Sequence, residues 1–378
     1  MIRSPLRLLA AAVVLTAATA VPGRANPADQ APAIDVVLCL DVSGSMEGLV
    51  NSARIKMWDL VNGLAKVKPT PTLRVGLYSY GHTTYDPNAG WVRKESDLTT
   101  DLDEVYKKLN NLTINGGEEY VARVCRDALV QQKWAEGKNS LKLIFVCGNE
   151  PVDQDKQVHL KDVARLAKEK GVIINTIYCN WGHPDEEAGW KTFAADAAGQ
   201  YALIEHNQKV VQIVTPQDKE LVRLNEKLNG TFIAFAGHAN MEKKANQLAQ
   251  DANAGAAGAP ALASRVATKG GALYRNEAWC IVSKAMVDKD FDISKVPEDQ
   301  LPDELKKMKP EERVAYVKKK IAEREQIQKE IAEVNAQRAK YIAEESKKSA
   351  SASDKALDTA LRGMIREEAA SRGIKVPE

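Results

Sequence analysis

The feature that most constrains the fold is an apolar run that ends abruptly in a cluster of polar side chains. Residues 36–40 are all apolar, and a short apolar run bounded by turn residues is typical of a strand buried on both faces. Directly after it come Asp41, Ser43 and Ser45, and an amphipathic run begins near Met46. A carboxylate and two hydroxyls therefore leave the end of a buried strand together, which in open α/β sheets is where ligands bind.

The rest of the N-terminal half alternates between strand-like and helix-like segments. Strands are expected over residues 73–80, 141–147, 172–178 and 201–204, with amphipathic helical stretches between them. This alternation predicts an α/β fold, a doubly wound and mostly parallel sheet with helices on both faces. Right-handed crossovers then bring the ends of consecutive strands to one edge of the sheet.

The polar residues at the first strand's end suit a metal ion. Carboxylate and hydroxyl oxygens, with no softer ligand beside them, are typical ligands of a hard cation such as Mg²⁺. The pattern Asp41-x-Ser43-x-Ser45 after such a strand resembles the metal-ion-dependent adhesion site (MIDAS) of von Willebrand factor type A (VWA) domains. The resemblance implies a Rossmann-like VWA fold and a divalent cation, Mg²⁺ or in its place Mn²⁺ or Ca²⁺.

In that family three loops hold the cation, and this chain departs from the pattern in two of them. Glu118 stands where the second loop usually has Thr, and Gly148 stands where the third has Asp, with Asn149 next to it. The resemblance therefore implies Asp41, Ser43, Ser45, Glu118 and Asn149 as the ligand set.

The departures leave three outcomes open for the cation. With Glu118 in reach, two anionic groups would already offset a divalent charge, so a partner's carboxylate would gain less from the metal. The cation could then be bound tightly in a structural role, be bound with Glu118 as an internal pseudo-ligand, or be absent.

Two enzyme motifs also place an acid or a serine at such a turn. Phosphotransferases of the haloacid dehalogenase type carry a second Asp two residues after the first, where this chain has Ser43. A G-x-S-x-G nucleophile elbow needs glycines where this chain has Asp41 and Ser45. Neither motif fits, so no catalytic residue is predicted, and a plain helix-capping turn is the simplest competing interpretation.

The first 25 residues predict a signal peptide. Arg3 and Arg7 precede an apolar stretch over residues 8–20, and small residues that suit cleavage end at Ala20 or Ala25. That stretch is too short to span a bilayer, which needs about 20 residues. We therefore expect a secreted or periplasmic protein with no transmembrane segment after cleavage.

Composition narrows the classes of partner. The formal net charge is +2, from 53 basic and 51 acidic residues, so there is no bulk attraction to nucleic acid. The five cysteines match no metal-binding spacing. They favour buried free thiols, although one disulfide between Cys147 and Cys179 stays open.

The chain divides by composition into four parts: a signal peptide (1–25), a VWA domain (33–207), a helical linker region (208–300) and a charged long-helix tail (301–378). An Ala/Gly-rich stretch over residues 254–260 predicts a flexible connector. Lys320, Arg324 and Arg338 interrupt the heptads of the long helix, which favours packing on neighbouring helices over a dimeric coiled coil.

These features predict a non-enzymatic exported binding protein whose cation site engages a protein or cell-envelope partner. The alternative is a structural scaffold with a degraded metal site that binds through its helical tail. An envelope hydrolase fits least well, because no nucleophile–base pair is apparent and the phosphate-binding motif G-x-x-x-x-G-K-[ST] occurs nowhere. The sequence predicts no oligomeric state.

Overall fold

The structure, a computed structural model, describes residues 32–137, 140–180, 182–205, 212–348, 357–372 and 374. The expected signal peptide lies outside these residues. Within the described ranges, no helix is both long enough and apolar enough to cross a membrane.

The N-terminal half forms one six-stranded sheet. Its strands are β1 (Ala33–Asp41), β2 (Thr72–Tyr80), β3 (Val92–Thr99), β4 (Ser140–Gly148), β5 (Ile173–Asn180) and β6 (Tyr201–Glu205), in the order β3-β2-β1-β4-β5-β6. Only β3 is antiparallel to its neighbour, and the other neighbouring strands are parallel. The predicted doubly wound, mostly parallel sheet is confirmed.

Helices cover both faces of this sheet, because successive side chains of its central strand point to opposite faces. Val36, Leu38 and Leu40 share a core with α1 (Glu47–Leu64) and α2 (Leu102–Asn110). Val37 and Cys39 share another with α3 (Val121–Gln131), α4 (Leu160–Lys170) and α5 (Glu187–Asp196). With both faces covered, β1 is buried along almost its whole length.

Residues beyond the sheet build a helical region with its own core. Its helices are α6 (Gln217–Asn229), α7 (His238–Ala256), α8 (Ala259–Lys269), α9 (Ile281–Val287), α10 (Asp303–Lys306) and α11 (Pro310–Lys348). The prediction of a flexible connector over residues 254–260 is wrong. The alanines continue α7 to Ala256 and start α8 at Ala259, with Gly258 in the tight turn between them.

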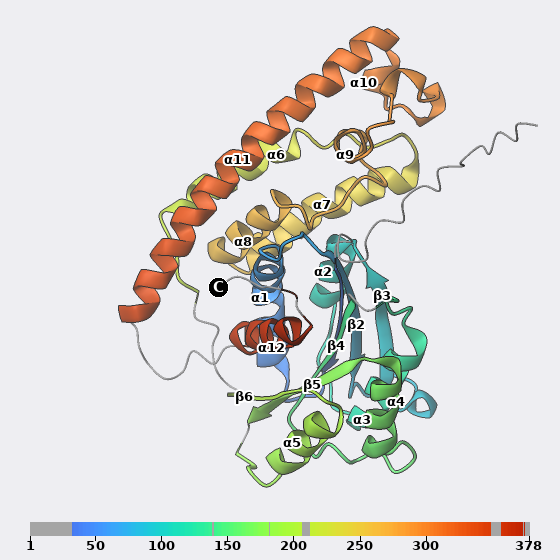
Figure 1. The fold of residues 1–378 in the computed structure, drawn as a ribbon, viewed down its shortest axis with the longest axis vertical. Coiled ribbons are helices and arrows are strands. Elements are labelled where there is room, and N and C mark those ends of the chain that lie inside the picture. The colour runs from blue at the N-terminus through green and yellow to red at the C-terminus, as the bar shows by residue number, and fades with distance from the viewer. Residues whose placement is uncertain are drawn as a thin grey trace, which may run out of the picture. The chain divides into compact units, whose positions relative to one another are not determined.

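The long helix α11 packs along α6 and also meets α8 and α9 (Figure 1). The charged residues that interrupt its heptads account for this arrangement. Arg324 donates to the Thr231 carbonyl oxygen at 2.6 Å, and Arg338 donates to Asp218 at 2.8 Å. Both arginines are buried, so they anchor α11 to this chain.

The last helix, α12 (Leu357–Ser371), returns to the sheet and lies beside α1 (Figure 1). Leu361, Met364, Ile365 and Ala369 are buried in the core that α1 and β1 share. Residues 357–371 thus pack with the sheet domain, although they follow the long charged helix in sequence.

A buried ionic network joins α2 of the sheet domain to the helical region. Arg265 of α8 donates to Asp103 of α2 and to Asp251 of α7, both at 2.7 Å. Lys269 donates to Asp251 at 2.8 Å, and both cationic side chains are fully buried. The helical region is therefore docked through specific polar contacts.

Candidate metal centre at the strand ends

The predicted first loop leaves the end of β1 between the ends of its two neighbouring strands. Asp41 pairs in register with Tyr80 of β2, and Leu40 pairs with Cys147 of β4. The Val42 amide donates to the Tyr80 carbonyl oxygen at 2.9 Å, and the Asn115 amide donates to the Val42 carbonyl oxygen at 3.0 Å. These bonds fix the first loop against β2 and the second loop.

Asp41, Ser43, Ser45 and Asn149 lie together in one chain of contacts. The Ser43 amide donates to Asp41 Oδ1 at 2.7 Å, and the hydroxyls of Ser43 and Ser45 are 3.4 Å apart. Asn149 Nδ2 donates to Ser45 Oγ at 3.0 Å. The first and third loops therefore meet as the sequence predicted, and whether they bind a metal stays a prediction.

The acid of the second loop is a different residue from the one expected. Glu118 is exposed, whereas Glu119 is buried. A Cβ atom added at Gly81 would lie 3.0 Å from Asp41 Oδ1 and 3.2 Å from Glu119 Cγ, so both acids pack against the same glycine. Glu119, and not Glu118, thus stands beside Asp41.

Close packing between two backbone segments explains why Glu119 points inward and Glu118 does not. A Cβ atom added at Gly117 would lie 2.7 Å from the Gly81 carbonyl oxygen, so position 117 faces inward and only glycine fits. With position 117 fixed in this way, Glu118 is exposed and Glu119 is buried. Sequence reasoning missed Glu119, because the contact between Gly117 and Gly81 joins residues far apart in the chain.

The third loop offers an amide because its first position cannot hold a side chain. A Cβ atom added at Gly148 would lie 2.5 Å from Tyr80 Oη and 3.0 Å from Trp190 Cη2. Tyr80 is held there by donating to the Cys147 carbonyl oxygen at 2.9 Å. Asn149 is therefore the residue of this loop that reaches Ser45.

The electrostatics of the site are governed by burial. Burial raises the pKa of Asp41, although hydrogen bonding with Glu119 and Ser43 favours its charged form. Burial and then the charge of Asp41 raise the pKa of Glu119 more strongly. Two adjacent buried carboxylates repel each other, so without a cation the pair retains a proton on Glu119.

Two buried oxygen atoms in the site have unmet hydrogen-bonding capacity. Neither Asp41 Oδ2 nor Asn149 Oδ1 accepts a bond from any N–H or hydroxyl group of the described residues. A proton on Glu119 can serve only one acceptor, whereas a cation can be shared by all of these oxygens. The donor set is entirely oxygen, so the residues present fit a hard divalent cation.

The site needs these neutral oxygens, because acids alone do not suffice. Across the described residues, no three or more His, Cys, Asp or Glu side chains gather in a metal-binding arrangement. His82 is buried, with Thr84 N donating to its Nδ1 at 3.2 Å and Thr113 Oγ1 lying 3.2 Å from its Nε2. It stabilises the loop after β2.

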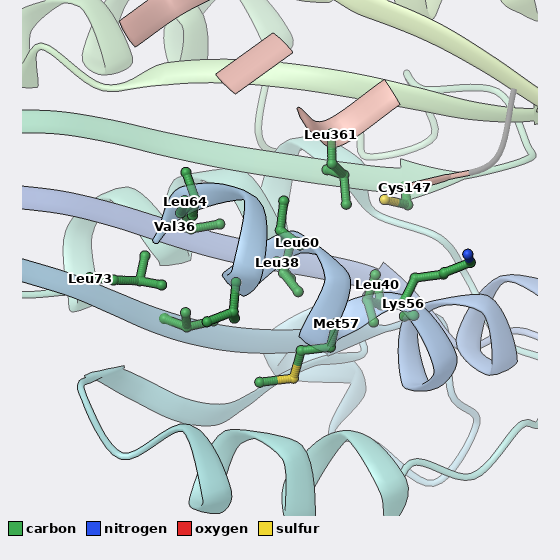
Figure 2. Close-up of a pocket in the computed structure, with 13 residues that line it drawn as sticks. Val36, Leu38, Leu40, Lys56, Met57, Leu60, Leu64, Leu73, Cys147 and Leu361 are labelled. Carbon is green, nitrogen blue, oxygen red and sulfur yellow. The ribbon is translucent and has the colours of Figure 1, made fainter. Parts of the chain in front are cut away.

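A separate apolar pocket lies under α1 and α12 (Figure 2). It is lined by Val36, Leu38, Leu40, Ala53, Lys56, Met57, Leu60, Val61, Leu64, Leu73, Val75, Cys147 and Leu361. Burial raises the pKa of the Cys147 thiol, which makes it a poor nucleophile. All five cysteines are buried and free, so Cys147 and Cys179 form no disulfide in this structure.

The family model of the von Willebrand factor type A domain matches residues 35–219. None of the curated proteins matches this chain.

Solved structures with similar folds share little sequence with this chain. One is proximal thread matrix protein 1 (PTMP1) from the mussel byssus with a zinc-occupied MIDAS motif, at 13% identity and a TM-score of 0.37, covering 47% of this chain and 43% of that one. Another is an aerotolerance-related membrane protein from Bacteroides fragilis, at 14% identity and a TM-score of 0.33, with 46% of this chain and 92% of that one covered. The pilus adhesin SpaC from Lactobacillus rhamnosus GG has 13% identity and a TM-score of 0.36, with 47% of this chain and 28% of that one covered. It is the family match that identifies the sheet domain: this chain belongs to the proteins that carry a von Willebrand factor type A domain, here over residues 35–219.

Proposed function

We propose that this chain is a non-enzymatic exported binding protein whose VWA domain holds a divalent cation at the strand ends. The edge that carries the cation engages a protein or cell-envelope partner. Domains of this family generally mediate protein–protein interactions, and the interpretation of residues 1–25 as a signal peptide supports export.

The observation that carries this proposal is the pair of buried oxygens, Asp41 Oδ2 and Asn149 Oδ1, that accept no hydrogen bond from an N–H or hydroxyl group of the described residues. Leaving a buried acceptor unmet costs about 1–3 kcal/mol. A cation between the loops would remove that cost and offset the charge of Asp41. Asp41, Ser43, Ser45 and Asn149 would hold it, with the second loop beside them, and the ion would supply a fixed positive charge at this edge.

Two features support a role in binding rather than catalysis. The Ser43 hydroxyl lies 3.4 Å from the Ser45 hydroxyl, and the nitrogens of His82 are engaged by Thr84 and Thr113 instead of by a serine. Glu150, the remaining acid of the third loop, accepts from Gln154 Nε2 at 2.8 Å. The site therefore resembles a set of cation ligands more than a nucleophile and its base.

Calorimetric titration of Mg²⁺ and Mn²⁺ into the full chain tests this proposal. We expect saturable binding to the wild type and an affinity lower by about tenfold or more in Asp41→Asn, because a ligand charge is lost. The matched control is Asp97→Asn, which removes an exposed carboxylate on β3 and should leave the affinity unchanged. Absence of binding to the wild type, or equal binding to all three proteins, would contradict the proposal.

A further inference from the structure

The buried acid of the second loop, Glu119, changes what this cation site can recognise. We propose that Glu119 is a ligand of the cation and that it and Asp41 together balance a divalent charge within the chain. The partner then engages this edge without placing a carboxylate on the metal. This inference rests on the proposed function, because it requires that the site binds a cation.

The first step is the placement of Glu119 among the predicted ligands. It packs with Asp41 and Ser43 against Gly81, where an added Cβ atom would lie 3.2 Å from Glu119 Cγ and 3.5 Å from Ser43 Cβ. Its backbone is held in place as well, since the Glu119 amide faces Gln154 Oε1 at 3.4 Å. Glu119 therefore reaches the same oxygen cluster as the first loop, while Glu118 stays exposed.

The second step is that no other loop supplies this charge. Position 148 is closed to any side chain by Tyr80 and Trp190, and Asn149 is neutral. The Glu150 carboxylate is bound by Gln154, and its carbonyl oxygen accepts from Trp190 Nε1 at 2.9 Å. Asp41 and Glu119 are thus the two carboxylates that pack together at this edge, and Glu150 adds to their negative charge from nearby.

The third step follows from simple charge arithmetic. A divalent ion held by one carboxylate and neutral oxygens keeps a net positive charge and attracts an external carboxylate. With a second carboxylate already beside it, that attraction is largely cancelled. Asp41 and Glu119 repel each other when both are charged, so a cation between them is what allows both buried carboxylates to carry their charge.

Mn²⁺ titration of the full-length wild type, Asp41→Asn, Glu119→Gln and Glu118→Gln tests the ligand assignment. We expect Glu119→Gln to lose about tenfold or more in Mn²⁺ affinity, whereas Glu118→Gln, the exposed neighbour in the same loop, keeps the wild-type value. Equal affinity of Glu119→Gln and the wild type would overturn the inference.

Thermal unfolding of the same proteins separates a ligand from a residue that only supports the fold. Without metal, Glu119→Gln should unfold near the wild-type temperature, because the amide keeps the size of the side chain. The rise in unfolding temperature on adding Mn²⁺ should be smaller in this variant. A residue with a purely structural role would lower the metal-free unfolding temperature and leave the Mn²⁺-induced rise intact, which would count against the inference.

Acetate serves as the probe for an external carboxylate. Titrated into the Mn²⁺-loaded proteins and followed by the electron paramagnetic resonance of Mn²⁺, acetate should produce no saturable change in the wild type. In Glu119→Thr acetate should produce a saturable change, because a neutral hydroxyl leaves the ion with less negative charge around it. Equal acetate binding by both proteins would overturn the inference.

The outcomes also distinguish this inference from the function on which it rests. If the wild type binds no Mn²⁺, or Asp41→Asn binds it as well, the proposed function fails. If Asp41→Asn loses Mn²⁺ and Glu119→Gln does not, the cation site stands and only the role of Glu119 is wrong.

Discussion

At the scale of single residues, Tyr80 occupies the space into which a side chain at position 148 would extend. Gly148→Ala places a methyl group 2.5 Å from Tyr80 Oη and 3.0 Å from Trp190, so we expect it to lower the free energy of unfolding by about 1–3 kcal/mol. Tyr80→Phe alone should cost about 1 kcal/mol, because the Cys147 carbonyl loses its donor. In the double variant the hydroxyl clash is gone, and part of the loss should be recovered.

Urea unfolding of the four proteins measures this coupling as a double-mutant cycle. Strictly additive effects of the two substitutions would contradict the steric explanation for glycine at position 148.

The residues of the site could be predicted from sequence only where they directly follow a predicted strand. Asp41, Ser43 and Ser45 are fixed by the end of β1, so their proximity could be inferred from sequence. Asn149 could be named as well, because it follows β4 directly. The choice between Glu118 and Glu119 could not be made, since it depends on contact between Gly117 and Gly81, whose positions are far apart in the chain.

At the scale of elements, the docking of α12 contains a buried carboxyl group. Asn175 of β5 donates to Glu368 Oε2 at 3.2 Å, and Oε1 has no partner among the described residues. Burial raises the pKa of Glu368 to about 7, although Asn175 and Arg372 favour its charged form. Docking of α12 therefore favours the protonated acid.

The raised pKa predicts how stability depends on pH. The unfolded chain loses the Glu368 proton near the ordinary value of about 4.3, whereas the folded chain keeps it until about pH 7. The stability that protonated Glu368 contributes is therefore fully present below pH 4 and is lost as pH rises to 7. Glu368→Gln does not titrate, so its free energy of unfolding should rise relative to the wild type by about 2–3 kcal/mol between pH 4.5 and pH 7.5. Urea unfolding at the two pH values measures this difference.

The neighbouring Glu367 provides the matched control, because its side chain is exposed on the same helix. Glu367→Gln should follow the wild-type pH dependence. A gain of equal size in both variants would show that the burial of Glu368 is not the cause.

Elements with strong apolar patterns were predicted well, and polar ones were not. The strand-like pattern ends near Arg93, but β3 runs over Val92–Thr99. It is an antiparallel edge strand that pairs only with β2. All but one of its side chains are exposed or half-buried, so they carry no apolar signal. In α11 the arginines that interrupt the heptads are buried contacts, which a heptad pattern cannot represent.

At the scale of the whole molecule, Arg265 is a fully buried ionic link between the VWA domain and the helical region. Arg265→Leu would leave Asp103 buried without this partner and Asp251 paired with Lys269. Removing one member of a buried ionic network costs about 3–5 kcal/mol. We expect a lower unfolding temperature by calorimetry and a split of the wild-type transition into two.

The exposed pair of Arg223 and Glu220 on α6 supplies the control for this experiment. Arg223→Leu should leave the calorimetric transition unchanged, because exposed ion pairs contribute little. A single, unshifted transition in Arg265→Leu would mean that Arg265 does not couple the two parts.

The position of α12 has a consequence for how the protein is made. Its residues complete a core whose other members belong to the first strands and helix of the chain, and they lie well beyond the 35–219 span of the family match. The ribosome must therefore release residues 357–371 before the core around β1 and α1 is complete. Until then, the apolar surface that α12 covers is exposed, which gives chaperones a defined binding site on the nascent chain.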